Sequence, residues 1–399
     1  MLKGKTVVIG ISGGIAVYKV CDVVSRLKKL NANVHVIMTK SAKEFVAPLT
    51  FQSLSQQPVI EDMFDKVTKW DIEHIALAKA ADIFLVAPAT ANIIGKIANG
   101  IADDMLSTTI MATKSPVLIA PAMNTNMYEN PIVQNNMKKL EEYGYDFIEP
   151  DSGRLACGDK GIGKLASPEA IVENIKLKLL QNNFLKGKKV LVTAGPTKES
   201  LDPVRYLTNH SSGKMGYAIA EAAILKGADV TLISGPVNIN KPIGLKNFIQ
   251  INTANEMFEA VTDNYLEQDI IIKSAAVADY RPATFSNNKI KKSNNDMNLT
   301  LTRNEDILKW IGKHKKEHQT IVGFAAETND ILHNGQKKLV KKNVDLMVIN
   351  DISKPYAGFG TDTNQITLID IYGGKQSYPI MQKKELANII LDYIIKFNK

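Results

Sequence analysis

The chain has 399 residues, of which 45% are hydrophobic and 23% charged, with a formal net charge of +8 at pH 7. This is ordinary globular composition, and the length suffices for two or three compact domains. Its two cysteines, Cys21 and Cys157, exclude a disulfide framework and a thiolate metal cluster. No apolar stretch approaches the ~20 residues of a membrane-spanning helix, so we expect a cytoplasmic protein without a membrane partner.

Lysines account for the positive charge and cluster at 289–292, 313–316 and 337–342. Such clusters are usually solvated faces of a protein. None of them has the interleaved aromatic residues of a nucleic-acid-binding motif, so we expect no nucleic-acid partner. Anionic small molecules are the better functional interpretation of this charge.

The two halves of the chain open alike. GKTVVI at 4–9 is echoed by GKKVLV at 187–192, and similar strand patterns recur at 32–37 and 228–233 and at 82–86 and 269–272. A helical pattern lies between the first two strands of each half. The apolar face of the first helix consists of Ala16, Val20, Val23, Val24 and Leu27, and that of the second helix consists of Ile219, Ala222, Ala223 and Leu225. Cys21 is expected in the core beside the first of these faces.

Repeated strand, helix and strand units predict an α/β protein with two doubly wound parallel-sheet domains. We expect the first to be flavodoxin-like and the second Rossmann-like. The polar stretch 181–186 is the expected seam, which gives domains 1–186 and 187–399.

Neither half carries a dinucleotide signature. GISGG at 10–14 does not match G-x-G-x-x-G, and the second strands end in MTK at 38–40 and SGP at 234–236 without a ribose-binding acid. These features argue against NAD, and no P-loop motif occurs. Hydroxyls, glycine amides and a helix N-terminus suit a phosphate monoester such as that of FMN.

The first half carries two motifs directly after expected strands: APATAN at 87–92 and PAMNTNM at 121–127. The carboxyl ends of parallel strands are where such sheets bind ligands. With the Gly-Gly-Ile turn at 13–15 and a histidine before the third strand, residues 3–175 resemble the flavin-dependent cysteine decarboxylases.

That resemblance implies an FMN site formed by Ser12, Gly13, Thr39, Phe45, Ser107 and Thr108, with Ala89, Thr90 and Asn92 near the isoalloxazine. Each serine and threonine has an equally good interpretation as a turn or helix-cap residue.

The resemblance also assigns catalytic roles. His74 would be the base, Asn124 would hold the substrate carboxylate, and Cys157 would return a proton from a glycine-rich lid at 151–164. The flavin supplies the redox chemistry of the decarboxylation. The alternatives are a structural histidine between apolar neighbours and a spare cysteine in a surface loop.

In the second half, TAGPT at 193–197 and NHSSGKMG at 209–216 precede an alanine-rich helix. Small residues with free amides before a helix make an anion cradle, although Ser211 or Ser212 would also serve as a simple N-cap. Together with AAVADYRP at 275–282, KIKK at 289–292, GFAAET at 323–328 and KKNVD at 341–345, these motifs resemble phosphopantothenate-cysteine ligases from Gly187 to the C-terminus.

By this resemblance CTP activates the carboxylate of 4'-phosphopantothenate as an acyl-cytidylate, with release of pyrophosphate, before the amine of L-cysteine attacks. Lys289 would neutralise developing phosphate charge and Asn209 would hold the intermediate. The implied CTP contacts are Ser212, Asp279, Lys289, Glu305, Asp306, Ile307, Leu308, Phe324, Lys338 and Lys342. Glu305 departs from the pattern, because a proline usually follows the asparagine at 304.

His314 and His318 have the i, i+4 spacing of zinc ligands, but lysines 313, 315 and 316 surround them. A solvated helical face is the better interpretation, so no dedicated metal ligands are expected. Magnesium is expected to arrive with the nucleotide.

With both halves in this order, the chain resembles the bacterial bifunctional phosphopantothenoylcysteine decarboxylase/phosphopantothenate-cysteine ligases of coenzyme A synthesis. Those enzymes imply a homo-oligomer, a dodecamer built from decarboxylase trimers and ligase dimers. The alternatives are an FMN-binding prenyltransferase, a flavin-binding regulatory or assembly protein and a flavodoxin-like electron carrier. The first of these does not explain P-A-M-N, Cys157 or the second half.

Overall fold

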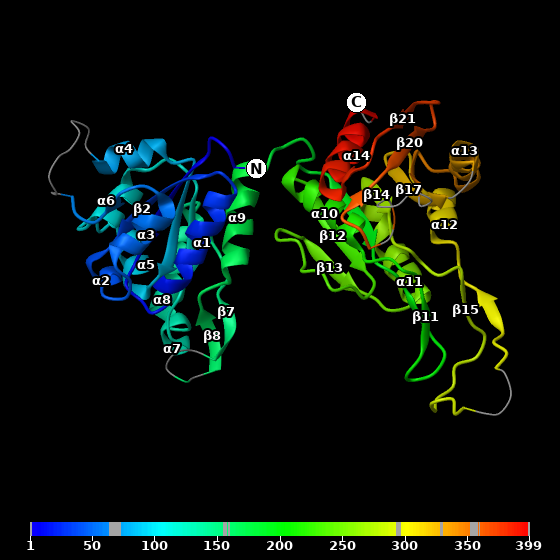
Figure 1. The fold of residues 1–399 in the computed structure, drawn as a ribbon, viewed down its shortest axis with the longest axis horizontal. Coiled ribbons are helices and arrows are strands. Elements are labelled where there is room, and N and C mark those ends of the chain that lie inside the picture. The colour runs from blue at the N-terminus through cyan, green and yellow to red at the C-terminus, as the bar shows by residue number, and fades with distance from the viewer. Residues whose placement is uncertain are drawn as a thin grey trace. The chain divides into compact units, whose positions relative to one another are not determined.

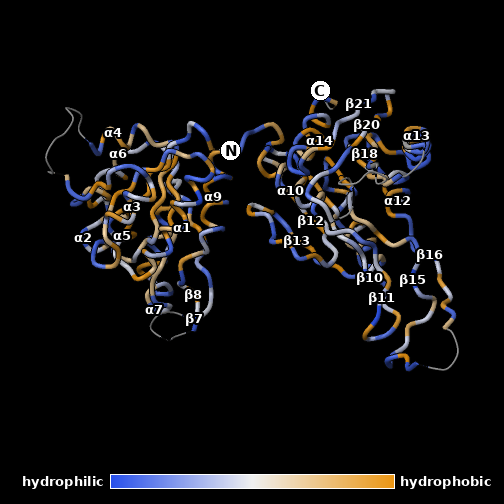
Figure 2. The backbone as a smooth tube through the Cα atoms, in the orientation of Figure 1, coloured by the Kyte–Doolittle hydropathy of each residue, from blue (hydrophilic) through white to orange (hydrophobic). Residues whose placement is uncertain are grey.

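The computed structural model describes residues 2–63, 73–154, 158, 160–292, 297–327, 330–351, 358 and 360–397. The chain divides into unit 1, Met1–Leu180, and unit 2, Gln181–Lys399 (Figure 1). Hydrophobic residues concentrate in the interior of each unit (Figure 2). Within these described ranges no helix combines the length and the apolar character needed to cross a membrane.

Unit 1 is built on a parallel sheet. Its strands follow the order β3 (Val59–Ile60), β2 (Asn33–Met38), β1 (Thr6–Ile11), β4 (Ile83–Ala89), β5 (Val117–Pro121) and β6 (Asp146–Phe147). Without the two-residue edge strand β3, this is the flavodoxin order. The flavodoxin-like expectation is confirmed, and the order reverses between β1 and β4, where such sheets bind ligands.

The helices of unit 1 cover both faces of its sheet. They are α1 (Val17–Lys29), α2 (Lys40–Lys43), α3 (Pro48–Ser55), α4 (Glu73–Ala80), α5 (Ala91–Ala98), α6 (Met105–Ala112), α7 (Thr125–Tyr128), α8 (Pro131–Glu142) and α9 (Pro168–Leu180). Alternation along β1 sends Val7 and Ile9 into the core under α1, and Val8 into the core on the opposite face. The apolar face predicted for α1 is confirmed, and Cys21 packs beside it. A hairpin of β7 (Asp151–Arg154) and β8 (Lys160–Lys164) follows β6.

Unit 2 has an eight-stranded sheet. Its order is β13 (Asn247–Gln250), β12 (Asp229–Ser234), β9 (Lys189–Ala194), β14 (Ile270–Lys273), β17 (Thr320–Glu327), β18 (Leu346–Asp351), β20 (Ile366–Asp370) and β21 (Lys375–Ser377). The first six are parallel and have the Rossmann order 3-2-1-4-5-6, as expected. The last two are antiparallel and extend one edge beyond what the sequence pattern predicted.

Helices also cover the sheet of unit 2. They are α10 (Lys214–Leu225), α11 (Ala254–Asn264), the short η1 (Tyr265–Glu267), α12 (Ile307–His314), α13 (Ile331–Lys342) and α14 (Lys383–Phe397). Ile219, Ala222 and Ala223 of α10 are buried as predicted, whereas Leu225 is only part-buried. Three small ribbons complete the unit: β10 (Lys198–Ser200) with β11 (Tyr206–Thr208), β15 (Tyr280–Pro282) with β16 (Leu301–Arg303), and β19 (Thr363–Asn364) with β22 (Met381–Gln382).

Candidate active sites

In unit 1, the residues that follow β1 and β4 meet at the switch point of the sheet. The Ser12 hydroxyl donates to the Pro88 carbonyl at 2.6 Å and lies 3.2 Å from the Thr90 hydroxyl. The Thr90 amide donates back to Ser12 Oγ at 3.1 Å. Residues 78 positions apart are thereby fixed side by side at the edge where a doubly wound sheet binds its ligand.

The glycine turn after β1 packs closely against α2. A Cβ on Gly13 would lie 2.4 Å from Ser41 Cβ, which is closer than real side chains approach. Thr39 caps α2 and accepts a hydrogen bond from the Ala42 amide at 3.3 Å. The bare backbone of the turn, a threonine hydroxyl and a helix start together form a cradle whose chemistry fits a phosphate group.

The predicted residues of α6 form hydrogen bonds at the start of that helix. Ser107 is 1% exposed and forms a reciprocal capping box with Asp104, while the Thr108 hydroxyl donates to the Ala102 carbonyl at 3.3 Å. Thr90 likewise caps α5. For these residues the cap interpretation holds. The Ser107 amide donates to Asp104 Oδ1 at 2.8 Å and the Thr108 amide donates to the Asp104 carbonyl at 3.0 Å, so both amides are already used at the start of α6.

Three more residues predicted for the flavin site differ in exposure. Phe45 is 48% exposed, Ala89 is fully buried, and Asn92 is exposed on the first turn of α5. Phe45 therefore offers an aromatic face at the surface, whereas Ala89 contributes only backbone.

Asn124 lies beneath the β7–β8 hairpin. It caps α7 by accepting from the Asn126 amide at 2.8 Å, and the neighbouring Met123 amide donates to the Gly163 carbonyl of β8 at 2.9 Å. Gly163 has φ +129°, and a Cβ there would come within 2.4 Å of the Met123 carbonyl oxygen. The segment expected to be a lid therefore contains the paired strands β7 and β8, and β8 is hydrogen-bonded to the loop that carries Asn124. Cys157 lies outside the described residues.

His74 is not brought to Asn124 within one chain. It is part-buried in the first turn of α4, which packs against α6. Figure 1 places α4 at the end of unit 1 opposite α7, the helix that Asn124 caps. A decarboxylation site that uses both residues must therefore draw them from two copies of the chain.

In unit 2, the loop after β14 is tied to the loop after β9. The Ser274 hydroxyl donates to the Thr193 carbonyl at 2.8 Å, and the Ala276 amide donates to the Gly195 carbonyl at 2.9 Å. Asn209, before α10, donates its side-chain amide to the Ala276 carbonyl at 2.9 Å. The structure thus brings the predicted NHSSGK and AAVAD motifs together at the carboxyl edge of the sheet.

A cavity of about 150 Å³ lies at the N-terminus of α10. The predicted residues Ser212 and Phe324 line it, as does Lys214 of the predicted NHSSGKMG motif. Asn350 and Lys383 also line it, and neither was predicted from the sequence. The Asn350 side-chain oxygen is buried without a hydrogen-bond partner. No local pattern marks Asn350 and Lys383, because the fold brings them to the N-terminus of α10 from β18 and α14.

Charged residues gather on the opposite face of the same sheet edge. Asp306 caps α12 and pairs with Lys342 of α13, while Lys338 lies 2.6 Å from Glu327. Burial lowers the pKa of Lys342, and the nearby carboxylate of Asp279 opposes that shift.

Three predicted neighbours of Asp306 offer different groups. Ile307 is 2% exposed and packs in the core, and Leu308 packs against the same cluster, so both present only backbone to a ligand. Glu305 is exposed.

β15 and β16 belong to an arm that extends away from the sheet of unit 2 (Figure 1). Lys289 lies between these two strands in the sequence and is exposed. The arm is tied to the loop between β10 and β11, since buried Asp202 of that loop accepts from the amides of Ile290 at 3.1 Å and Arg205 at 2.7 Å. No described contact joins Lys289 to Asn209 within one chain.

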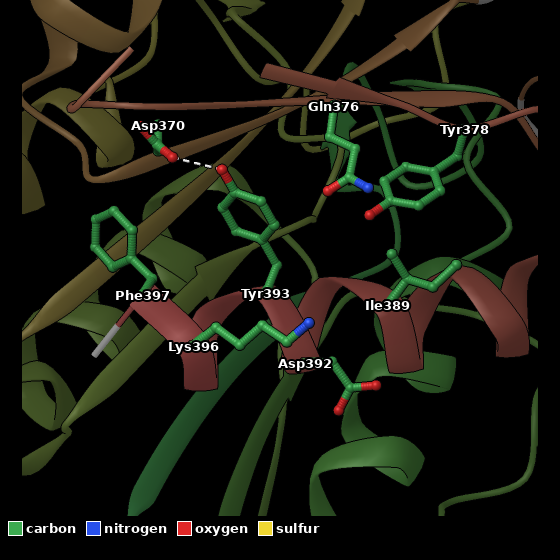
Figure 3. Close-up of a pocket in the computed structure, with 8 residues that line it drawn as sticks. All are labelled: Asp370, Gln376, Tyr378, Ile389, Asp392, Tyr393, Lys396 and Phe397. Atoms are coloured by element: carbon green, nitrogen blue, oxygen red, sulfur yellow. Dashed lines mark hydrogen bonds between the residues drawn. The ribbon is translucent and has the colours of Figure 1, made fainter. Parts of the chain in front are cut away.

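A second cavity, of about 460 Å³, lies between the antiparallel strands and α14 (Figure 3). Its walls include Gln376, Tyr378, Asp392 and Lys396, and the Tyr393 hydroxyl donates to Asp370. Burial and this contact raise the pKa of Tyr393 to about 12. None of the residues predicted from the sequence lines this cavity, so it is separate from both predicted sites.

Family models match both units. Residues 1–180 match the model described as Flavoprotein, and residues 185–397 match the DNA/pantothenate metabolism flavoprotein C-terminal domain. The coenzyme A biosynthesis bifunctional protein CoaBC of Bacillus subtilis is 52% identical over 406 residues, covering 100% of this chain and 98% of the relative. The protein of the same name from Escherichia coli is 43% identical over 397 residues, covering 99% and 97%.

Two solved structures are also similar. The crystal structure of the C-terminal domain of a coenzyme A biosynthesis bifunctional protein CoaBC has 42% identity and a TM-score of 0.47, covering 54% of this chain and 98% of that one. The FMN binding protein AtHal3 has 33% identity and a TM-score of 0.39, covering 44% and 96%.

Two doubly wound α/β units, the first matching a flavoprotein model, define a two-domain flavoprotein enzyme. More narrowly, the chain belongs to the family of bifunctional proteins of coenzyme A biosynthesis. It has the phosphopantothenoylcysteine decarboxylase and phosphopantothenate-cysteine ligase activities that the sequence resemblance predicted. A prenyltransferase or an electron carrier would leave the match of residues 185–397 unexplained.

Proposed function

We propose that residues 1–186 form an FMN-dependent decarboxylase domain and residues 187–399 a CTP-dependent ligase domain, both working in the cytoplasm. The observation that carries the first assignment is the contact between Ser12 and Thr90 at the switch point of the sheet, 3.2 Å between hydroxyl oxygens. The glycine turn and the capped start of α2 beside it suit the phosphate of FMN.

In this proposal the FMN phosphate is held by Ser12, Gly13 and Thr39 and by Ser107 and Thr108 in the first turns of α6. Ala89, Thr90 and Asn92 border the isoalloxazine, and Phe45 covers it. The bound flavin supplies the two-electron chemistry of decarboxylation. Asn124 orients the substrate carboxylate through its amide, and Cys157 donates a proton from the lid.

His74 acts as the base from a neighbouring copy of the chain. The separation of α4 from α7 within one unit supports this arrangement, because a shared site explains how both residues meet one substrate. We therefore propose decarboxylase trimers with the flavin at the subunit boundaries.

The ligase domain activates 4'-phosphopantothenate with CTP and then joins it to L-cysteine. Asn209, held 2.9 Å from the Ala276 carbonyl, positions the acyl-cytidylate. Ser212, Asp279, the 305–308 segment, Phe324, Lys338 and Lys342 bind the nucleotide, whose triphosphate brings the magnesium ion.

Lys289 reaches the triphosphate of a partner subunit from the arm. Several apolar side chains on and beside the arm are exposed, among them Tyr206 at 47%, Phe285 at 54% and Met297 at 55%. Exposed apolar residues that gather in this way are typical of a protein interface. Ligase dimers through this surface would join the trimers into the dodecamer.

The proposal is tested by separating the two activities. Full-length protein receives 4'-phosphopantothenate, L-cysteine, CTP and Mg²⁺, and pyrophosphate and carbon dioxide are measured. His74→Asn should abolish carbon dioxide release and leave pyrophosphate release intact. Lys289→Gln should slow pyrophosphate release and leave decarboxylation of added phosphopantothenoylcysteine intact. Loss of both activities from either substitution would contradict separate sites.

A further inference from the structure

Lys273 is the last residue of β14, at the carboxyl edge of the unit 2 sheet. It pairs with Thr193 of β9 on one side and with Gly323 of β17 on the other. Side chains alternate along a strand, so Lys273 shares a face with Ile271, which packs in the core beneath α12. The Lys273 side chain is therefore on the face that carries the N-terminus of α12, where Asp306 and Lys342 lie.

The space beside Lys273 is occupied by the first turn of α12. A Cβ on Gly323 would lie 2.7 Å from Leu308 Cδ2, so the Leu308 side chain fills the position that the glycine leaves open. The lysine stem thus lies next to the predicted nucleotide segment and is part-buried there.

The charges around Lys273 leave its ammonium group without a close counter-ion. Lys342 pairs with Asp306 and Lys338 with Glu327, but the side chain of Lys273 makes no hydrogen bond or ion pair with any described residue. Asp279 attracts the ammonium group from a longer distance, and Lys342 repels it.

The absence of a close partner has an energetic consequence. An ammonium group withdrawn from water without a hydrogen-bonded anion costs free energy. Burial accordingly lowers the pKa of Lys273 to about 8. An anion that arrives at this edge would supply the missing partner.

We propose that Lys273 binds a phosphate oxygen of the nucleoside triphosphate in the ligase site, beside Lys342. This inference rests on the proposed use of a nucleotide by unit 2. The bound anion replaces the counter-ion that the fold does not provide. Lysine suits this role because its ammonium group is a compact point charge on a flexible stem.

A phosphate contact through Lys273 predicts a particular pH dependence. Three charged groups face Lys273: Asp279 after β14, Asp306 at the start of α12 and Lys342 of α13. The residues paired with Lys273 on the neighbouring strands, Thr193 of β9 and Gly323 of β17, carry no charge. Since the free ammonium group loses its proton near pH 8, CTP affinity should fall between pH 7 and pH 9. Arginine stays charged over this range.

The test is isothermal titration of the full-length protein with CTP and Mg²⁺ at pH 7 and pH 9. Lys273→Gln should weaken CTP binding about tenfold at pH 7, the loss expected for one charge-assisted contact, and should reduce the fall in affinity at pH 9. Lys273→Arg should bind CTP at both pH values. Lys313→Gln, an equal charge change on an exposed residue of α12, should bind like the wild type.

Two results would overturn the inference, and they are distinguishable. If the wild-type protein binds no CTP, the nucleotide assignment fails and the role of Lys273 fails with it. If the wild type binds CTP and Lys273→Gln binds equally well at both pH values, only the role of Lys273 fails. Thermal melting and the Lys273→Arg variant separate a binding defect from misfolding.

Discussion

Several residues predicted for the flavin site serve as helix caps in the structure. Thr39 and Thr90 were predicted both as flavin contacts and as caps, and the structure confirms the caps while placing both at the ligand edge. The cap interpretation follows from residue type and spacing. The contact of Ser12 with Thr90 does not, because it joins residues 78 positions apart and depends on the order of the strands.

Ser12→Ala should destabilise unit 1 and weaken flavin retention. Ser12 is 3% exposed, and its hydroxyl joins the Pro88 carbonyl to the Thr90 amide. Leaving the Thr90 amide without this acceptor should cost about 1–3 kcal/mol. Flavin absorbance after gel filtration and the melting temperature check this. Ser53→Ala, which removes only an exposed hydroxyl contact on α3, serves as control and should melt like the wild type.

Lys273→Met should stabilise unit 2 at pH 7 while weakening nucleotide binding. The pKa of Lys273 is about 8 in the folded protein and has its ordinary value of 10.5 in the unfolded chain, which therefore binds the proton more tightly. The free energy of unfolding consequently rises as the pH rises from about 8 to 10.5. Removing the ammonium group should therefore add roughly 1–3 kcal/mol at pH 7 and less at pH 10. Urea unfolding of unit 2 at both pH values measures this, and an equal effect at both would contradict it.

At the scale of elements, the parallel strands and the helices that cover them were predictable from the sequence. The β7–β8 hairpin and the antiparallel strands β20 and β21 were not. The strand and helix patterns around Val7, Val20 and Ile219 gave the right elements because burial on both faces leaves long apolar runs. The β7–β8 hairpin was expected only as a glycine-rich lid, because Gly161 and Gly163 weaken a strand signal. The antiparallel strands β20 and β21 were missed because their pairing is decided by contacts with β18.

Gly163→Ala should displace the hairpin and slow decarboxylation at least tenfold. Its φ of +129° is unfavourable for alanine, and the new Cβ would meet the Met123 carbonyl oxygen at 2.4 Å, next to Asn124. Gly144→Ala is the matched control, because it has φ +87° but no atom within 4 Å of its Cβ. The control should cost about 1 kcal/mol of stability and keep its activity. Equal decarboxylation rates in both variants would show that the hairpin does not position the site.

At the scale of the whole molecule, the sequence predicted two domains with different activities, a decarboxylase and a ligase. Motif order along the chain was enough for that, because each motif follows its own strand. It did not predict that α4, which carries His74, and α7, which Asn124 caps, lie at opposite ends of unit 1, since the position of α4 depends on its packing against α6. The oligomer expected from the family resemblance stays a prediction.

A shared decarboxylation site predicts complementation between inactive variants. Proteins carrying His74→Asn and Asn124→Ala should each fail to release carbon dioxide, and their co-expression should restore part of the activity. Mixed oligomers then contain sites with one intact residue from each copy. The mixture of separately purified homo-oligomers, without subunit exchange, is the control and should stay inactive. Absence of any recovery after co-expression would place the whole site in a single chain.

The most direct test of the account follows both products in one reaction. Freshly purified full-length protein, which should be yellow, is given limiting 4'-phosphopantothenate with excess L-cysteine, CTP and Mg²⁺. The account predicts one pyrophosphate and one carbon dioxide for each 4'-phosphopantothenate consumed. Pyrophosphate release without carbon dioxide, from protein that is colourless and stays so after incubation with FMN, would contradict it.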